Sequence, residues 1–227
     1  YYPFNGNAND ESGNSNDGMV NGATLTTDRF GNADSAYDFD GIDDFIEILD
    51  NGGLDGFLGL TITGWVKLDV DANTSNAFCT KGGCYSGSHH FAYHTQFSTD
   101  YDGRTYFQIY ESDGPDRLEI YDDDPIALYD WTFVAFSWES SSSMIIYYND
   151  NLQMKVTNDV PSVMTNVSGN LDIGRRLNEC TSNQAWFKGL IDDIRIYNRS
   201  LSETEIKQLY WGAGTFTGCS QTKLDAQ

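Results

Sequence analysis

The chain has 227 residues, of which 34 are Asp or Glu and 13 are Lys or Arg, so its formal net charge is −21. Nucleic-acid phosphates and anionic membrane surfaces are bound by clustered Lys and Arg, so this charge excludes both as expected partners. The sequence contains no apolar run of about 18 residues that could span a bilayer. A hydrophobic content of 39%, with 14% aromatic residues, indicates a packed domain.

Short segments rich in Ile, Val, Thr, Tyr and Phe recur along the chain, and clusters of Gly, Asn, Asp and Ser separate them. This pattern predicts β-strands joined by turns. The predicted strands are residues 1–4, 36–40, 45–49, 60–68, 77–81, 90–97, 105–111, 117–121, 132–139, 144–149, 153–157, 171–174 and 189–197.

One helix is predicted, close to the end of the chain. Ser202 and Glu205 have the spacing of a capping box, and Ile206, Leu209 and Tyr210 follow with helical spacing. Many strands and one short C-terminal helix predict an all-β fold, a two-sheet antiparallel jelly-roll sandwich. We expect one domain over residues 1–211 and a polar tail over residues 212–227.

Four cysteines suggest two disulfides and therefore an oxidising, extracellular location for a secreted protein. Cys79 and Cys84 could close a Gly-Gly loop, which would leave Cys180 to pair with Cys219, although the connectivity stays open. A zinc site is the alternative, since three histidines follow closely at His89, His90 and His94. It is less favoured because neither cysteine pair has the two-residue spacing of a zinc knuckle.

Three segments carry a family resemblance. They are YPFNGNANDESGN at residues 2–14, FDGIDDFI at residues 39–46 and GLIDDIRIYNRSLS at residues 189–202. In this order and spacing they resemble the laminin-G-like, concanavalin A-like lectin/glucanase family of secreted bacterial polysaccharide-processing proteins, over residues 2–211. The resemblance implies a concanavalin A-like sandwich, a non-catalytic carbohydrate-binding or adhesion role beside an attached catalytic domain, and a structural Ca²⁺.

Asp192 is the residue that most directly indicates a metal site. Strand alternation places it on one face with Ile194 and Ile196, and a carboxylate turned toward a core needs a cation or several donors. Calcium is one answer, because it takes carboxylate and carbonyl oxygens. The resemblance places the ion at the three segments, with Asp10, Asn14, Asp40 and Asp192 as ligands. Hydrogen bonds from loop amides are the alternative.

A possible sugar-binding face follows from the same alternation. We expect three adjacent strands to turn aromatic, amide and cationic groups outward, and such groups suit sugar rings and acidic substituents. These residues are His90, His94, Arg104, Tyr106, Gln108, Tyr110, Arg117 and Tyr121. The loop over residues 175–186, with Arg175, Arg176 and Trp186, is a second candidate. The alternative is a face that is merely solvated or covered by a loop.

Motifs for catalysis are missing from the sequence. Retaining glucanases of this architecture carry alternating carboxylates on one strand, and no Glu-x-Asp-x-x-Glu or Glu-x-Asp-x-Glu pattern occurs. We therefore expect a monomeric, non-catalytic module that binds a polysaccharide, which could be acidic or sulfated. A protein-binding adhesion domain is the alternative, followed by a polysaccharide lyase that uses His90, His94 and Tyr106.

Overall fold

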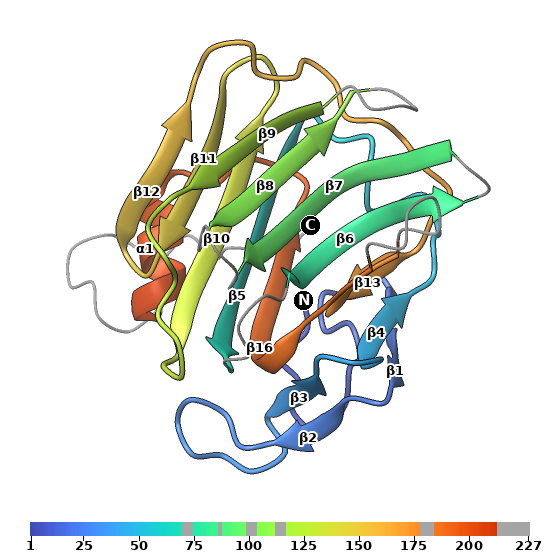
Figure 1. Cartoon of the computed structure of the whole chain (residues 1–227), viewed down its shortest axis with the longest axis vertical. Coiled ribbons are helices and arrows are strands. Elements are labelled where there is room, and N and C mark those ends of the chain that lie inside the picture. The colour runs from blue at the N-terminus through green and yellow to red at the C-terminus, as the bar shows by residue number, and fades with distance from the viewer. Residues whose placement is uncertain (70–74, 86–87, 99–103, 112–116, 178–183, 213–227) are drawn as a thin grey trace.

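The computed structural model describes residues 1–69, 75–85, 88–98, 104–111, 117–177 and 184–212, and of residues 84–89 it describes no side chain. Two seven-stranded antiparallel sheets stack face to face (Figure 1). The front sheet has the order β1 (Gly18–Asn21), β4 (Phe45–Ile48), β13 (Leu171–Ile173), β6 (Ser75–Tyr85), β7 (Ser88–Ser98), β8 (Thr105–Tyr110) and β9 (Arg117–Asp122). This arrangement confirms the predicted sandwich.

The back sheet has the order β12 (Asn151–Val156), β11 (Ser143–Tyr148), β10 (Thr132–Glu139), β5 (Gly59–Leu68), β16 (Lys188–Tyr197), β3 (Ala36–Asp40) and β2 (Thr24–Thr26). A separate two-stranded ribbon pairs β14 (Arg175–Arg176) with β15 (Ala185–Trp186). The predicted strand at residues 1–4 is wrong, because Tyr2 makes only an isolated bridge to Ile194. Strands β1, β2, β14 and β15 were not predicted, since they are short and carry little apolar alternation.

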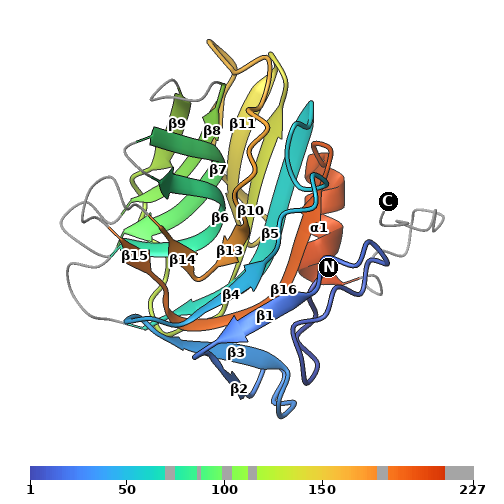
Figure 2. The ribbon, with the colours of Figure 1, turned by 90° about the vertical axis from the view of Figure 1, so that its right-hand side faces the viewer.

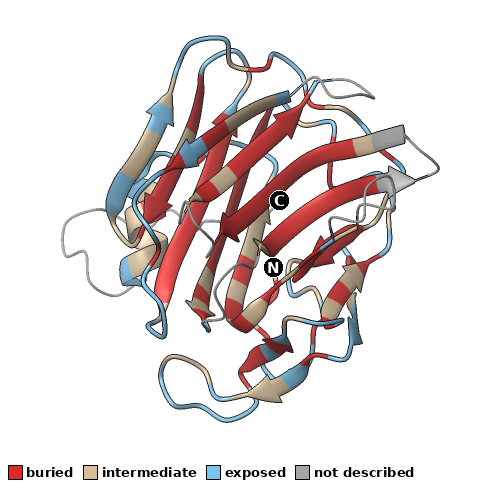
Figure 3. Ribbon diagram, in the orientation of Figure 1, coloured by how far each residue is buried: buried red, intermediate tan, exposed pale blue. Residues whose placement is uncertain are grey.

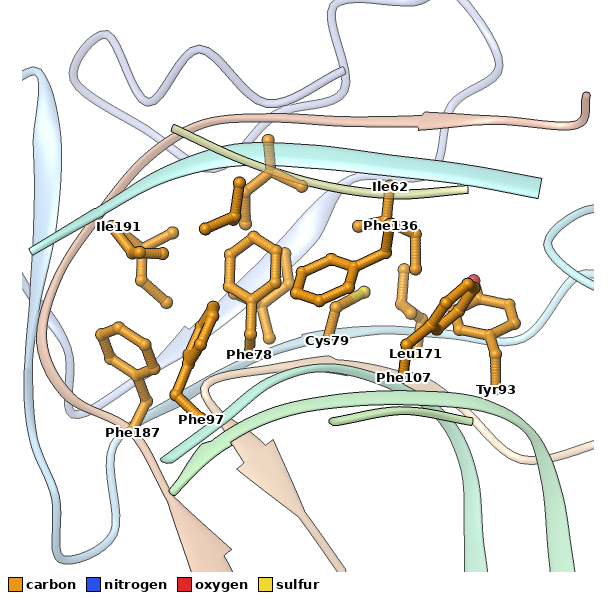
Figure 4. Packing of buried hydrophobic residues seen from close by; sticks show 14 of the residues in the cluster. Ile62, Phe78, Cys79, Tyr93, Phe97, Phe107, Phe136, Leu171, Phe187 and Ile191 are labelled. Carbon is orange, nitrogen blue, oxygen red and sulfur yellow. The ribbon is translucent and has the colours of Figure 1, made fainter. Parts of the chain in front are cut away.

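The core lies between the two sheets and is rich in phenylalanine. The ring centre of Phe136, in the back sheet, lies close to those of three phenylalanines of the front sheet. The distances are 5.7 Å to Phe107, 6.0 Å to Phe97 and 6.2 Å to Phe78. Figure 3 shows buried residues along the central strands, and Figure 4 shows these rings interleaved with Ile62 and Ile191. Rings that meet across the layers fix the stacking of one sheet on the other.

Helix α1 (Glu203–Trp211) packs on the outer face of the back sheet (Figure 2). The predicted capping box is confirmed: the Ser202 side chain accepts from the Glu205 amide, and the Glu205 carboxylate accepts from the Ser202 amide. Buried Ile206 and the ring of Tyr210, 5.6 Å from Trp65, attach the helix to the sheet. Among the described residues, no helix is long and apolar enough to cross a membrane.

A bulge in β16 gives Asp192 an environment that differs from the predicted one. The pairing with β5 shifts register between Asp192 and Arg195, and Asp193 has φ of +52°. Ile191 and Ile194 therefore both reach the core, whereas Asp192 lies opposite Trp65 on the outer face of the back sheet. The prediction that Asp192 shares the core face with Ile194 is wrong, although its carboxylate is buried as expected.

A second bulge lies where β7 pairs with β6. The register shifts between Lys81 and Gly82, so Ala92 and Tyr93 both join the core while Phe91 turns to the outer face. The strand alternation that predicts His90 and His94 to point outward also predicts Phe91 to point inward, but its ring instead stacks on Tyr110 at 5.3 Å. His90 consequently lies on the opposite side of the strand from Phe91, and not with His94 as predicted.

The predicted disulfide between Cys79 and Cys84 is wrong. Cys79 is a free thiol buried in the core (Figure 4), and burial raises its pKa above the ordinary range. The two cysteines lie on one continuous strand, β6, about 16 Å apart at strand spacing, whereas a disulfide needs Cα atoms within roughly 7 Å. Cys180, Cys219 and residues 213–227 of the predicted tail lie outside the described residues, as does the Cys84 side chain.

Candidate functional site

A row of polar side chains crosses the outer face of the front sheet. Residues paired directly across neighbouring strands point to the same face. The pairing aligns one residue from each of six strands, namely Glu47, Asp172, Thr80, His94, Gln108 and Glu119. We call this set the polar row.

His94 occupies the middle of the polar row and is only 1% exposed. Its Nδ1 lies 2.8 Å from Thr80 Oγ1, and its Nε2 lies 3.1 Å from Gln96 Oε1. Burial, together with the nearby charge of Arg176, lowers the pKa of His94 well below its ordinary value. The imidazole is therefore neutral, and both of its nitrogens are engaged within the protein.

Arg176 reaches from β14 onto the polar row. Its guanidinium Nη1 donates to Gln96 Oε1 at 3.0 Å and lies 3.4 Å from His94 Nε2. Its buried Nε has no hydrogen-bond partner among the residues that the structure describes. Burial lowers the pKa of Arg176, but a guanidinium stays charged at neutral pH. In the described part of the chain, no carboxylate lies within ion-pair distance of Arg176.

Gln108 and Tyr110 extend this network toward β9. The Tyr110 hydroxyl donates to Gln108 Oε1 at 2.7 Å, and Gln108 Nε2 donates to the Glu119 carboxylate. Arg117 lies 3.7 Å from Glu119 and 5.9 Å from the centre of the Tyr110 ring. Gln108 and Tyr110 are nearly buried, so they support the face more than they line its surface.

Aromatic rings with an arginine form the accessible part of the face. The guanidinium of Arg104 lies 4.4 Å from the centre of the Tyr121 ring and pairs with Asp123 at 2.7 Å. The rings of Tyr106 and Tyr121 lie 6.2 Å apart, and Tyr121 is 40% exposed. This pair of tyrosines offers an aromatic surface beside the polar row.

Arg175 and Trp186 play a different part from the one predicted. Arg175 pairs with Asp172 at 2.8 Å and Glu47 at 3.3 Å, and its guanidinium lies 3.4 Å from the Phe45 ring centre. Trp186 packs against Phe45 from the other strand of the ribbon. The ribbon is thus fixed to the sheet, and it brings Arg176 onto the face: the two predicted sites form one surface.

The four predicted calcium ligands do not meet in one place. The Asp10 carboxylate accepts from the Tyr1 amino nitrogen, the Ser12 amide and the Asn16 amide, and Asp192 pairs with Arg29. Asn14 donates its side-chain amide to Ser12. These residues therefore do not fit one ion as a set.

Asp40 belongs to a different acidic cluster. Among the described residues, the one group of three metal-ligating side chains with ligand atoms within 4.8 Å of one another is Asp40, Asp43 and Asp44. Asp44 is buried, and burial raises its pKa, with the neighbouring carboxylates acting in the same direction.

Comparison with known proteins identifies the family. The profile of the concanavalin A-like lectin/glucanases superfamily matches residues 39–207. The chain belongs to this superfamily. No curated protein sequence matches it.

Solved structures with low sequence identity share the fold. Domain 4 of AbnA, an extracellular arabinanase from Geobacillus stearothermophilus solved with arabinotriose, is 20% identical with a TM-score of 0.71, over 92% of this chain and 96% of that one. A heptameric SAP-like pentraxin from Limulus polyphemus is 14% identical with a TM-score of 0.59, over 76% and 80% of the two chains.

The ligand-binding domain of botulinum neurotoxin serotype D, solved with N-acetylneuraminic acid, is a third match. It is 13% identical with a TM-score of 0.62, over 86% of this chain and 46% of that ligand-binding-domain chain. At such identities the similarity establishes the sandwich and leaves the ligand to the chemistry of the site.

Residue patterns anticipated part of this site. Strand alternation indicated that His94, Tyr106, Gln108, Tyr110, Arg117 and Tyr121 share a face, and the pairing of β7, β8 and β9 brings them together. Thr80, Asp172 and Glu47 were missed, because their strands come from distant parts of the sequence. Arg29, the partner of Asp192, lies in a loop with no motif to indicate it.

Proposed function

We propose that this chain is a non-catalytic carbohydrate-binding module of a secreted polysaccharide-processing protein, attached to a catalytic domain. The polysaccharide binds the outer face of the front sheet. The observation that carries this proposal is Arg176, a cation without a contacting carboxylate among the described residues, held over a row of planar polar groups.

The chemistry of the face suits an acidic or sulfated polysaccharide. A guanidinium binds carboxylate or sulfate oxygens with two parallel hydrogen bonds, and it needs no counter-charge from the protein to do so. The Tyr106 and Tyr121 rings, next to Arg104, can support the apolar side of a sugar ring. The net charge of −21 acts against anions at long range, but salt screens it beyond about 8 Å under physiological conditions.

Binding without catalysis is supported by the position of His94. A general base must reach the proton that it removes, within hydrogen-bond distance or through one water. His94 is almost completely buried and both its nitrogens contact Thr80 and Gln96. It is poorly placed to act as the base of a lyase, and the bulge in β7 moves His90 off this face.

Affinity gel electrophoresis in polygalacturonate tests the proposal. Arg176→Gln removes the charge, and Tyr121→Ala removes an exposed ring. We expect each variant to be retained less by the gel. The apparent affinity should fall at least tenfold, which corresponds to about 1.4 kcal/mol of binding free energy. Arg199→Ala is the control, since Arg199 pairs with Glu205 beside α1. Full retention of both face variants contradicts the proposed site, and binding to proteins without binding to any glycan favours the adhesion role.

We also propose that the chain binds calcium at the cluster of Asp40, Asp43 and Asp44. Three carboxylates close together, one of them buried, suit a hard cation with oxygen ligands. Calcium at 100 times its dissociation constant should stabilise the fold by about 2.7 kcal/mol. We expect the thermal midpoint to rise on adding calcium, to fall on chelation, and to become insensitive in Asp43→Asn but not in Asp123→Asn. An unchanged midpoint in the unmodified protein rejects this site.

A further inference from the structure

A pocket of about 580 Å³ lies at the edge of the sandwich, away from the polar row. It forms where the N-terminal segment, the loop after β4, the end of β16 and α1 come together. Figure 2 shows the N-terminus next to α1 and β16. Its volume falls within the range of small-ligand pockets, roughly 300–1,000 Å³.

One wall of the pocket is an open strand edge. Ile194 exchanges both of its backbone hydrogen bonds with Tyr2, at 2.8 and 3.0 Å, on the side of β16 that faces away from β5. Backbone groups in an antiparallel strand repeat every second residue, so the amide and carbonyl of Ile196 point to this same side. Strand β3 pairs with β16 only from Lys188 to Ile191. Within the described chain, no strand covers Ile196 on this edge, and Ile196 lines the pocket.

The other walls combine aromatic rings with side-chain amides. Tyr1, Phe57 and Tyr197 line the pocket, as do Asn14 and Asn198. Asn14 donates to Ser12 and keeps its carbonyl oxygen available, and Asn198 is exposed with no hydrogen bond from its amide in the described part of the chain. The pocket therefore offers donors, acceptors and apolar rings together.

Charged groups of the pocket are already neutralised. The Asp10 carboxylate accepts three hydrogen bonds from nitrogen donors, which hold its pKa at about 2 although burial opposes them. Arg195 lies 4.4 Å from the centre of the Tyr1 ring, donates to the Tyr1 hydroxyl at 3.3 Å, and is 3.7 Å from Asp193. A charged ligand would gain little here, so the pocket favours a neutral one.

The loop that forms one side of the pocket is anchored before any ligand arrives. Lys81 is fully buried, and its Nζ lies 2.6 Å from Asp50 and 3.4 Å from Asp55. Asp55 also accepts from the Val167 amide at 2.9 Å. These contacts hold both ends of the segment from Asn51 to Leu54, and a pre-formed wall reduces the entropy lost on binding.

We propose that this pocket is a second carbohydrate site, which binds one neutral sugar residue through the edge of β16, the amides of Asn14 and Asn198, and the surrounding aromatic rings. The inference rests on the proposed function only for the class of ligand, a saccharide. It concerns a different surface, with opposite charge selectivity: the polar row with Arg176 takes acidic groups, whereas the pocket takes a neutral ring.

Amide chemical-shift mapping by NMR separates the two surfaces. The probes are arabinotriose, which is neutral, and trigalacturonate, which is acidic. We expect arabinotriose to shift the amides of residues 12–14 and 196–198. The double variant Asn14→Ala/Asn198→Ala should weaken that response at least tenfold, whereas Asn158→Ala, at an exposed asparagine elsewhere, should leave it unchanged.

The outcomes distinguish this inference from the proposed function. Shifts at the polar row with trigalacturonate, without any pocket response to arabinotriose, overturn the second site and leave the proposed function intact. Pocket shifts with a silent polar row support the second site and contradict the proposed face. A pocket response that survives unchanged in the double variant overturns the assigned amide contacts.

Discussion

Arg29, in the loop between β2 and β3, pairs with two neighbouring carboxylates of β16. Its Nη1 donates to Asp192 and its Nη2 donates to Asp193 at 2.6 Å, while its guanidinium lies 4.7 Å from the centre of the Trp65 ring. Asp192 is 2% exposed, so water has little access to its carboxylate while Arg29 is in place. A buried carboxylate without a partner is strongly unfavourable, so Arg29 stabilises the folded state by pairing with Asp192.

At pH 8, above the pKa of Asp192, we expect Arg29→Ala to lower the free energy of unfolding by about 3–5 kcal/mol, because it leaves the Asp192 charge buried and alone. Urea unfolding measures the loss. Asp192→Asn in the Arg29→Ala background should recover part of it, since the amide carries no charge. Arg104→Ala, at a more exposed ion pair, should change stability by less than about 1 kcal/mol. A loss of that small size in Arg29→Ala contradicts the account of Asp192.

The sequence showed that the Asp192 carboxylate needs a partner, but it did not show that the partner is Arg29. A carboxylate among Ile191, Ile194 and Ile196 signals that a partner must exist, and the expected partner was a metal ion. The partner found, Arg29, is 163 positions away in the chain. No local pattern can connect two such residues, because only the pairing of the sheets brings them together.

Within each strand, alternation predicted the correct face for the side chains as long as the strand was regular. Across a bulge, the predicted face was the opposite of the observed one. It placed Tyr106, Gln108 and Tyr110 outward and therefore the intervening Phe107 and Ile109 in the buried layer, as the structure has them. It failed at Phe91 and at Asp192. Each bulge adds one residue to a strand, and that residue reverses the face of everything that follows. Gly82 was the available signal for one of them, since a glycine inside a strand commonly marks a bulge.

Gly82→Ala tests whether this bulge needs a glycine. Gly82 has φ of +95°, and an added Cβ would meet the His90 carbonyl oxygen. Gly31 is the matched control, with φ of +89° and open space around it. We expect Gly31→Ala to cost about 1 kcal/mol, from backbone strain alone, and Gly82→Ala to cost clearly more. Equal losses in chemical denaturation would show that the close approach of β7 does not matter.

The acidity of the whole molecule shapes its dependence on pH. Burial raises the pKa of Asp192 to about 7 and that of Asp172 to about 6, whereas an unfolded Asp titrates near 4. Between these values Asp192 and Asp172 bind more protons in the folded state than in the unfolded state. Buried, neutral His94 acts in the opposite direction but is one group against two, so stability still rises as the pH falls from 8 to 5. The hydrogen bond and charge of Arg199 hold the pKa of Glu205 at about 2, and Asp10 has a similarly low value, so stability falls again below pH 4.

We therefore expect the thermal midpoint, measured in EDTA, to peak near pH 5 and to lie on the order of 5 °C above its value at pH 8. Asp172→Asn should reduce this difference, because it removes one of the two titrating groups. The same substitution at exposed Asp123 should not, since that side chain is 71% exposed. A midpoint that is highest at pH 8 contradicts the assigned burial of these carboxylates.

The overall architecture followed from the sequence more completely than the site did. Short apolar segments and the capping box at Ser202 were sufficient for two antiparallel sheets and one helix. The position of Arg176 was not predictable, because it depends on a two-stranded ribbon beside β6 from which the side chain reaches Gln96 of β7. The pocket beside β16 was equally hidden, since four separate segments contribute to it.

A crystal structure of the protein with bound trigalacturonate tests the central claim most directly. We predict a carboxylate of the ligand within hydrogen-bond distance of the Arg176 guanidinium, with a sugar ring against Tyr106 and Tyr121. A trisaccharide bound elsewhere on the molecule, with the polar row uncovered, would contradict the account.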